Sequence, residues 1–194
     1  MRLLAVAAVA LVGLIASPAV AQTNAPSWLD RPLTNWNSAA RAIPAAPSAD
    51  ETTASVIARC KLKPPRSTAG EKALASAGWI AFWNFDRQLV ADGVEVVGGM
   101  RGGDGMCRPI TYNLFVFVDG RFAGTLAPAP MSSRLDASSG AVRLPPSGIT
   151  AEFARYTSAV ALCCPSSRVT VGYRVDRTPA GPVVVPIEIR NTRP

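Results

Sequence analysis

The chain has 194 residues, of which 48% are hydrophobic, and a formal net charge of +7. This composition excludes a predominantly disordered chain, and the length suffices for one domain of ordinary size with a buried core. The chain contains no histidine. Nucleophilic catalysis by a Ser-His or Cys-His pair is therefore excluded, because the general base is missing.

The positive charge comes mainly from arginines, which are scattered singly between Arg59 and Arg193. A basic protein can bind nucleic acid, anionic lipid or acidic glycan. The chain has no dense basic run and no basic-aromatic motif of a nucleic-acid-binding module. We therefore expect a solvated arginine-rich surface and no nucleic-acid partner. Weak binding to anionic polymers stays open as an alternative.

Residues 1–21 have the pattern of a secretory signal peptide. Leu3 to Ile15 form an apolar run after Arg2, and Ala19-Val20-Ala21 is a small-x-small cleavage site. A retained membrane helix would need about 20 apolar residues, and Ser17-Pro18 interrupts the run sooner. We expect an exported mature chain, periplasmic or extracellular, that begins near Gln22. No cysteine lies near the cleavage point, so we expect no lipid anchor.

Residues 22–49 are predicted to form an irregular N-terminal arm, because prolines interrupt any long periodicity. The arm contains two tryptophans, Trp28 and Trp36. Such residues can anchor a partner, but they more often pack a loose arm onto its own domain, which is what we expect here. Residues 50–194 are then expected to form a single α+β domain.

One ambiguous segment and one helix come first in this domain. Asp50–Arg59 is compatible with a short helix or with a strand, because its threonines leave the preference open. Thr68 and Glu71 have the spacing of a capping box. They predict a helix over Ala69–Ala77 that stops at Gly78.

Strand patterns follow the helix. Trp79–Phe85 is aromatic and extended in character, and Gln88–Val97 is predicted to form a hairpin around Asp92-Gly93. The glycine-rich stretch Gly98–Gly105 is expected to be a loop. It lacks the residue order of a phosphate-binding loop and no helix follows it, so we expect a flexible connection and no cofactor.

The strongest short-range signal in the chain is the hairpin Tyr112–Leu126. A run of strand-forming residues meets Asp119-Gly120 and then resumes as Arg121–Leu126. Asp-Gly between two such runs predicts a two-residue turn with positive φ at Gly120. A long turn-rich link over Pro128–Gly140 comes next.

The later strands alternate apolar and polar residues, which predicts a sheet with one face on a core and the other in water. Pro186 is expected to point outward from an edge strand. The fold class predicted is α+β, with a predominantly antiparallel sheet, one or two short helices and disulfides. The residues expected to face inward are Ile149, Ala151 and Phe153; Val169, Val171, Tyr173 and Val175; and Val183, Val185, Ile187 and Ile189.

The four cysteines of an exported chain indicate two disulfides. Cys163 and Cys164 are adjacent, and a bridge between neighbours strains the intervening peptide. We therefore expect each of them to pair with a distant cysteine, Cys60 or Cys107, in either of two connectivities. A metal site is disfavoured, because the chain has neither a CxxC pair nor a histidine.

Carboxylates are the remaining side chains that could support catalysis. Several of them neighbour glycines in predicted turns, and others fall on the polar side of predicted strands. Their spacing singles out no pair. We predict no catalytic residue, with a secreted carboxylate-dependent hydrolase as the alternative.

Five segments of the chain carry a likeness to a known family: Gly105–Pro109, Phe115–Leu126, Met131–Asp136, Ala151–Tyr156 and Leu162–Ser166. Taken together in their order, they resemble the LppP/LprE lipoprotein family of bacterial envelope proteins. The likeness runs over about Trp79 to Pro186. It implies an exported envelope protein without implying a particular activity, so we expect a non-catalytic binding or structural module with an unidentified envelope partner. The chain departs from the family name in having no cysteine directly after its signal segment, and we expect no stable membrane anchor.

Overall fold

The computed structural model describes residues 26–62, 68–82, 89–157 and 164–192 of the chain. The predicted signal segment lies outside these residues. The elements in chain order are η1 (Trp28–Asp30), α1 (Thr53–Arg59), α2 (Ala69–Ser76), β1 (Ile80–Phe82), β2 (Leu89–Ala91), β3 (Val94–Gly103), β4 (Pro109–Val118), β5 (Arg121–Thr125), β6 (Ser139–Arg143), β7 (Ile149–Arg155), β8 (Ser167–Thr178) and β9 (Gly181–Thr192).

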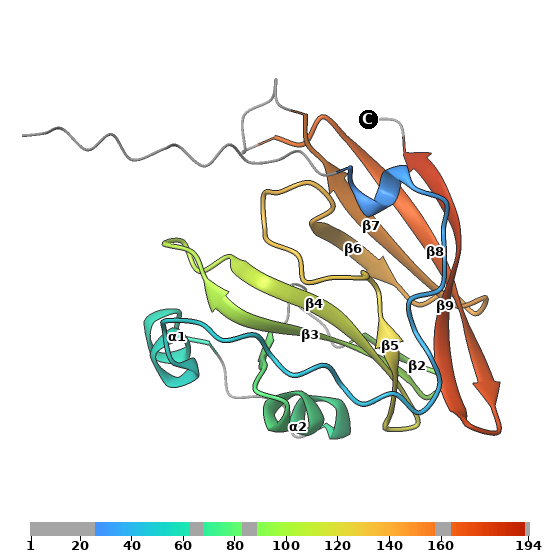
Figure 1. The fold of residues 1–194 in the computed structure, drawn as a ribbon, viewed down its shortest axis with the longest axis horizontal. Helices are drawn as coiled ribbons and strands as arrows, with labels where there is room; N and C mark the ends of the chain where they lie inside the picture. The colour runs from blue at the N-terminus through green and yellow to red at the C-terminus, as the bar shows by residue number, and fades with distance from the viewer. Residues whose placement is uncertain (1–25, 63–67, 83–88, 158–163, 193–194) are drawn as a thin grey trace, which may run out of the picture.

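The strands form two antiparallel sheets, as Figure 1 shows. Sheet A has the order β1-β3-β4-β5, with β2 also paired with β3, and sheet B has the order β6-β7-β8-β9. Every strand pair is antiparallel. The predicted α+β class with mostly antiparallel sheet and short helices is therefore confirmed.

The main hydrophobic core lies between the two sheets. Leu114 and Val116 of β4 belong to one buried cluster with Phe153 of β7 and with Val171 and Tyr173 of β8. The alternation predicted for β7 and for the first half of β8 is confirmed, because these strands bury every second residue.

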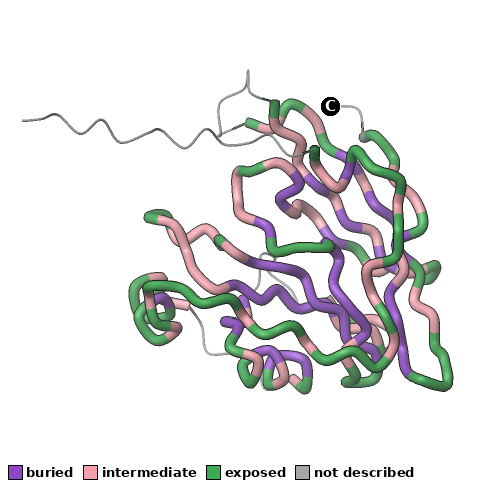
Figure 2. The backbone as a smooth tube through the Cα atoms, in the orientation of Figure 1, coloured by how far each residue is buried: buried purple, intermediate pink, exposed green. Residues whose placement is uncertain are grey.

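A second cluster covers the outer face of sheet A, which is the face turned away from sheet B. Val97, Phe115 and Phe117 pack there with Leu74 of α2, and Ile43 from the N-terminal arm packs against them. Sheet A is thus buried on both faces, which explains the unbroken buried run along β4. Figure 2 shows this run through the middle of the molecule.

Local signals set the two helices. The Thr52 side chain accepts a hydrogen bond from the Ser55 backbone N–H and begins α1, so the ambiguous segment is helical. Thr68 and Glu71 form the predicted capping box at the start of α2. Gly78 follows α2 with φ +84°, the left-handed conformation that terminates a helix.

Both predicted Asp-Gly hairpins are present. Asp119 and Gly120 have φ values of 49° and 76°, and Asp92 and Gly93 have values of 50° and 74°. Positive φ at both central residues is the geometry of the type I′ turn, whose twist matches that of the flanking strands.

The prediction of a loop over Gly98–Gly105 is wrong for most of its length, because β3 continues through Gly103. Neighbouring aromatic rings explain why β3 contains glycine at positions 98 and 99. A Cβ built on Gly98 would lie 2.8 Å from the Phe82 ring, and one built on Gly99 would lie 2.8 Å from the Phe115 ring. Glycine makes room for a ring on each face of the strand.

The inward face predicted for the last strand is also partly wrong. Gly172 pairs with Glu188 while Tyr173 pairs with Pro186, so Ile187 is the extra residue of a β-bulge. As a result Pro186 is buried and Ile187 is 47% exposed. The bulge moves the alternation by one residue, and Val184 instead of Val183 joins the core. The edge position predicted for the proline strand is correct.

The N-terminal arm packs onto the sheets through its tryptophans, as expected. The ring centroid of Trp28 lies 5.1 Å from that of Phe153, and Trp36 meets Tyr173 edge-on at 6.5 Å. Arg155 of β7 holds the start of the arm through an ion pair with Asp30 at 2.9 Å. Among the described residues, no helix is long and apolar enough to span a membrane.

Candidate functional site

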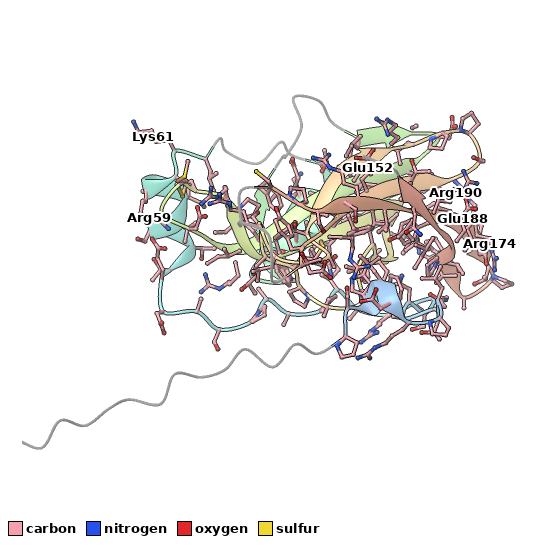
Figure 3. The ribbon with its side chains drawn as sticks, turned by 90° about the horizontal axis from the view of Figure 1, so that it is seen from above. Arg59, Lys61, Glu152, Arg174, Glu188 and Arg190 are labelled. Atoms are coloured by element: carbon pink, nitrogen blue, oxygen red, sulfur yellow. A yellow bond between two sulfur atoms is a disulfide. The ribbon has the colours of Figure 1, made fainter. Side chains whose placement is uncertain are left out.

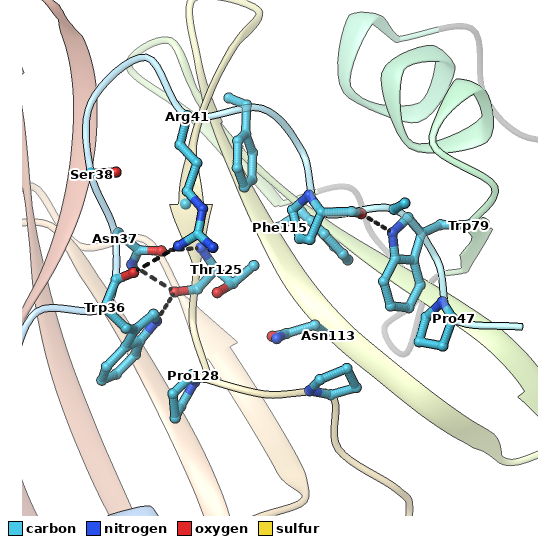
Figure 4. A pocket seen from close by; sticks show the side chains of 15 residues that line it. Trp36, Asn37, Ser38, Arg41, Pro47, Trp79, Asn113, Phe115, Thr125 and Pro128 are labelled. Atoms are coloured by element: carbon cyan, nitrogen blue, oxygen red, sulfur yellow. Dashed lines mark hydrogen bonds between the residues drawn. The ribbon is translucent and has the colours of Figure 1, made fainter.

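A groove with a volume of about 260 Å³ opens on the outer face of sheet A (Figure 4). Its floor is Phe115 of β4 together with Phe122 and Thr125 of β5. The arm forms one rim, and the loop that follows β5 forms the other. Prolines line both rims: Pro44 and Pro47 on the arm, and Pro128 and Pro130 on the loop.

Two residues of the arm anchor one end of the groove to β5. The Trp36 indole N–H donates to the Thr125 carbonyl at 3.0 Å. The Asn37 amide donates to the same carbonyl at 3.0 Å and accepts from the Thr125 N–H at 2.9 Å. Gly124 leaves space for this amide, since a Cβ there would lie 2.3 Å from the Asn37 carboxamide carbon. The arm thereby completes the edge of sheet A.

The opposite rim is held by a buried amide. Asn113 of β4 donates to the Ala127 carbonyl at 3.0 Å and to the Ala129 carbonyl at 3.3 Å. Its own oxygen accepts from the Leu114 N–H at 2.8 Å. Because these bonds use both N–H groups of the buried amide, Asn113 shapes the rim and leaves hydrogen-bond donation to a ligand to other residues.

Arg41 is the cation of the groove. Its exposed side chain reaches back along the arm, and its guanidinium donates to the Trp36 carbonyl at 3.3 Å (Figure 4). No carboxylate among the described residues pairs with it. Its remaining N–H groups are available to an anionic or strongly polar group of a ligand.

The groove combines aromatic and proline walls with one guanidinium. Trp36 and Trp79 add their rings to those of Phe115 and Phe122, and no aspartate or glutamate is among the described lining residues. Such a site can hold an apolar ring and fix an acceptor group by hydrogen bonding. It offers no pair of carboxyl groups for acid–base chemistry.

Sequence reasoning did not identify this groove. Its residues come from the arm, β4, β5 and the following loop, and no local spacing joins them. The one sequence feature that could have indicated the groove is the composition of the arm, which has tryptophans and repeated prolines ahead of a strand-rich region.

The cysteines predicted as site residues lie elsewhere. Cys60, just after α1, forms a disulfide with Cys107 in the turn between β3 and β4, with a Cα–Cα distance of 5.4 Å. The expectation that each of these two pairs with Cys163 or Cys164 is therefore wrong. The fold places the end of α1 beside the β3–β4 turn, a proximity that sequence spacing does not reveal. Cys164 is exposed, and Cys163 lies outside the described residues.

Charged side chains also stabilise the region around the Cys60–Cys107 disulfide. Arg59 pairs with Glu51 at 2.8 Å and donates to the Gly103 carbonyl at 3.0 Å. The hydrogen bond with Arg59 lowers the pKa of Glu51, and the same bond raises the pKa of Arg59. Backbone N–H donation from Arg108 is the main cause of a lowered pKa at Asp104. These contacts hold α1 against the β3–β4 turn. The charged side chains of Glu51, Arg59 and Asp104 therefore have a structural role.

The outer face of sheet B carries charges of both signs (Figure 3). Arg143 pairs with Glu152 at 3.2 Å, and Arg190 pairs with Glu188 at 2.6 Å. Alternating acidic and basic groups partly neutralise one another on this surface. A wet face with mixed charge is expected of a half-buried antiparallel sheet.

The model of the family described as LppP/LprE lipoprotein matches residues 85–178. The match includes the β4–β5 floor of the groove, whereas the arm that forms one rim precedes it. The searches of curated proteins and of solved structures give no match to this chain.

Proposed function

We propose that the chain, whose residues 85–178 match the model of the LppP/LprE lipoprotein family, works in the bacterial cell envelope as a non-catalytic binding module. Under this proposal the protein is exported, to the periplasm or beyond it. The ligand occupies the groove between the arm and sheet A. It is a small molecule with an apolar ring and one anionic group.

The observation that carries the proposal is the composition of the groove. Four aromatic side chains and four prolines line a space of about 260 Å³. Arg41 stands at this space without a carboxylate partner among the described residues. Apolar walls with a small number of convergent polar groups are the usual features of a small-molecule site. The apolar walls would contact the ring of the ligand, and the Arg41 guanidinium would pair with its anionic group.

The proposal is tested by titrating the protein with small cyclic carboxylates, such as benzoate and cyclohexanecarboxylate, and with their neutral amides. Binding is followed by tryptophan fluorescence, since Trp36 and Trp79 line the groove. We expect the carboxylates to bind more tightly than the amides. Arg41→Gln should weaken carboxylate binding about tenfold, since a hydrogen bond to a charged group contributes about 1.5 kcal/mol. Amide binding should not change.

A matched pair of arm variants distinguishes ligand binding in the groove from binding elsewhere on the surface. Ala45 lines the groove, and exposed Ala42 does not. Ala45→Trp should block binding of every compound, and Ala42→Trp should leave it intact. Absence of any carboxylate binding to the unaltered protein, or equal binding by the two variants, would show that the groove is not the site.

A further inference from the structure

The arm contains a proline-x-x-proline segment, Pro44-Ala45-Ala46-Pro47, which takes no part in a helix, strand or turn. An extended segment of this composition favours the polyproline II conformation, which has three residues per turn. The carbonyls of Pro44 and Pro47 therefore point to the same side of the segment. Both of them accept hydrogen bonds from side chains of sheet A.

The donors are Trp79 and Arg101. The Trp79 indole N–H donates to the Pro44 carbonyl at 2.8 Å, and the Arg101 Nε donates to the Pro47 carbonyl at 3.1 Å. β1 pairs with β3 through Ile80 and Met100, so Trp79 and Arg101 are neighbours just beyond this pair. Two adjacent donors thus contact carbonyls that are one polyproline turn apart.

The Trp79 indole is held rigidly. Its side chain is buried, and its ring meets Phe115 edge-on with a centroid distance of 5.1 Å. Between the two prolines, the Ala46 N–H donates to the Ala77 carbonyl at 2.8 Å. An aromatic surface with an indole N–H directed at a proline carbonyl suits the recognition of proline-rich segments.

The segment is held by a small number of contacts. Pro44, Ala45 and Pro47 are exposed, whereas Ala46 packs against the cluster on the outer face of sheet A. Three hydrogen bonds, with Trp79, Arg101 and Ala77, join the segment to its surroundings. Exposed segments with few buried contacts open at low free-energy cost. The recognition surface is formed by residues outside the arm and remains when the segment leaves.

We propose that Trp79 and Arg101 form a binding site for proline-x-x-proline segments, which Pro44–Pro47 fill in cis and which a proline-rich segment of another envelope protein occupies when the arm is displaced. The arm is tethered, so its effective concentration at the site is on the order of millimolar and a free segment must compete with it. Weakening the arm segment therefore reveals binding in trans. Trp79, Pro44 and Pro47 also line the groove described above, so displacement of the segment opens one rim of that groove.

The test uses the full chain with Pro44→Ala and Pro47→Ala combined, and a fluorescent synthetic peptide with the sequence of residues 42–48. We expect fluorescence anisotropy to show at least about tenfold tighter peptide binding by this variant than by the unaltered protein, as release from a tethered competitor requires. A control peptide with alanine at both proline positions should bind neither protein.

Arg101→Gln, added to the double variant, identifies the surface used. It removes the Nε–H that donates to the second proline carbonyl, together with the positive charge, and should reduce peptide binding about tenfold. Circular dichroism and light scattering check that each variant is folded and monomeric. Equal peptide affinity in the unaltered and double-variant proteins, indifference to Arg101→Gln, or dimerisation of the variant by arm exchange would each overturn the proposal of a separate proline-rich partner.

Discussion

Asn37 and Thr125 are joined by a pair of hydrogen bonds of the kind that normally links two strands. The Asn37 amide donates to the Thr125 carbonyl at 3.0 Å and accepts from the Thr125 N–H at 2.9 Å. The same amide donates at 3.0 Å to the carbonyl of Val184 in β9. One side chain of the arm thus connects the edge strand of sheet A with the edge strand of sheet B.

Replacing Asn37 should loosen this connection. We expect Asn37→Ala to lower the free energy of unfolding by about 2 kcal/mol, since it removes three hydrogen bonds at a partly buried site that water can enter. Chemical denaturation monitored by circular dichroism measures the change. Ser38→Ala, at the exposed neighbouring position, should stay within about 0.5 kcal/mol of the unaltered protein. Equal effects of the two substitutions would contradict the bridging role.

The turn between β4 and β5 should be most stable with glycine at its second position. Gly120 has φ +76°, and its nearest neighbour for an added Cβ is Ala69 at 3.5 Å, so substitution causes backbone strain without a clash. Gly120→Ala should cost about 1 to 2 kcal/mol of unfolding free energy. Gly105→Ala is the matched control, because Gly105 has nothing within 4 Å and no positive φ. A stable Gly120→Ala protein with an unstable Gly105→Ala protein would refute this explanation.

The disulfide predicts a specific cross-linked peptide. Trypsin without reduction should release Cys60-Lys61 joined to Gly102–Arg121, since trypsin does not cleave the Arg108–Pro109 bond, and mass spectrometry should detect the pair. The bridge links residues separated by 47 positions, and its loss should cost about 4 kcal/mol in the chain-entropy description. Thermal unfolding of Cys60→Ser with Cys107→Ser measures this cost. A map that joins either cysteine to the segment containing Cys163 and Cys164 would contradict the pairing.

Stability should fall at high pH because of Tyr173. Burial raises the pKa of its phenol well above the usual value, and the hydroxyl donates to the Leu126 carbonyl. The unfolded chain releases this proton near pH 10 and the folded protein retains it, so the stabilisation is complete below about pH 10 and is lost as the pH rises further.

Tyr173→Phe checks this pH dependence. The variant should lose about 1 kcal/mol of unfolding free energy at neutral pH through its missing hydrogen bond. Between pH 9 and 11 its unfolding free energy should decline less steeply than that of the unaltered protein. Comparing the two proteins cancels the titration of lysines and of the other tyrosines. Parallel declines would show that Tyr173 has no part in the alkaline transition.

Features encoded by neighbouring residues were predictable from the sequence alone. The capping box of Thr68 and Glu71 and the Asp119-Gly120 turn depend on interactions over a few residues, and both are present. The buried alternation of β7 needs only a strand with one face on a core. In each case a local hydrogen bond, a permitted φ or the strand period determines the outcome.

Features that depend on which segments meet in space were decided by the tertiary structure. The Cys60–Cys107 pair requires α1 to lie beside the β3–β4 turn, and the strand through Gly98 and Gly99 requires the rings that cover them. The bulge at Ile187 shifts the face of β9 relative to β8. The groove exists because Trp36 and Asn37 of the arm contact Thr125, far along the chain. A sequence contains no spacing rule for such contacts, since chain-closure entropy changes only slowly with loop length and leaves packing to select the partner.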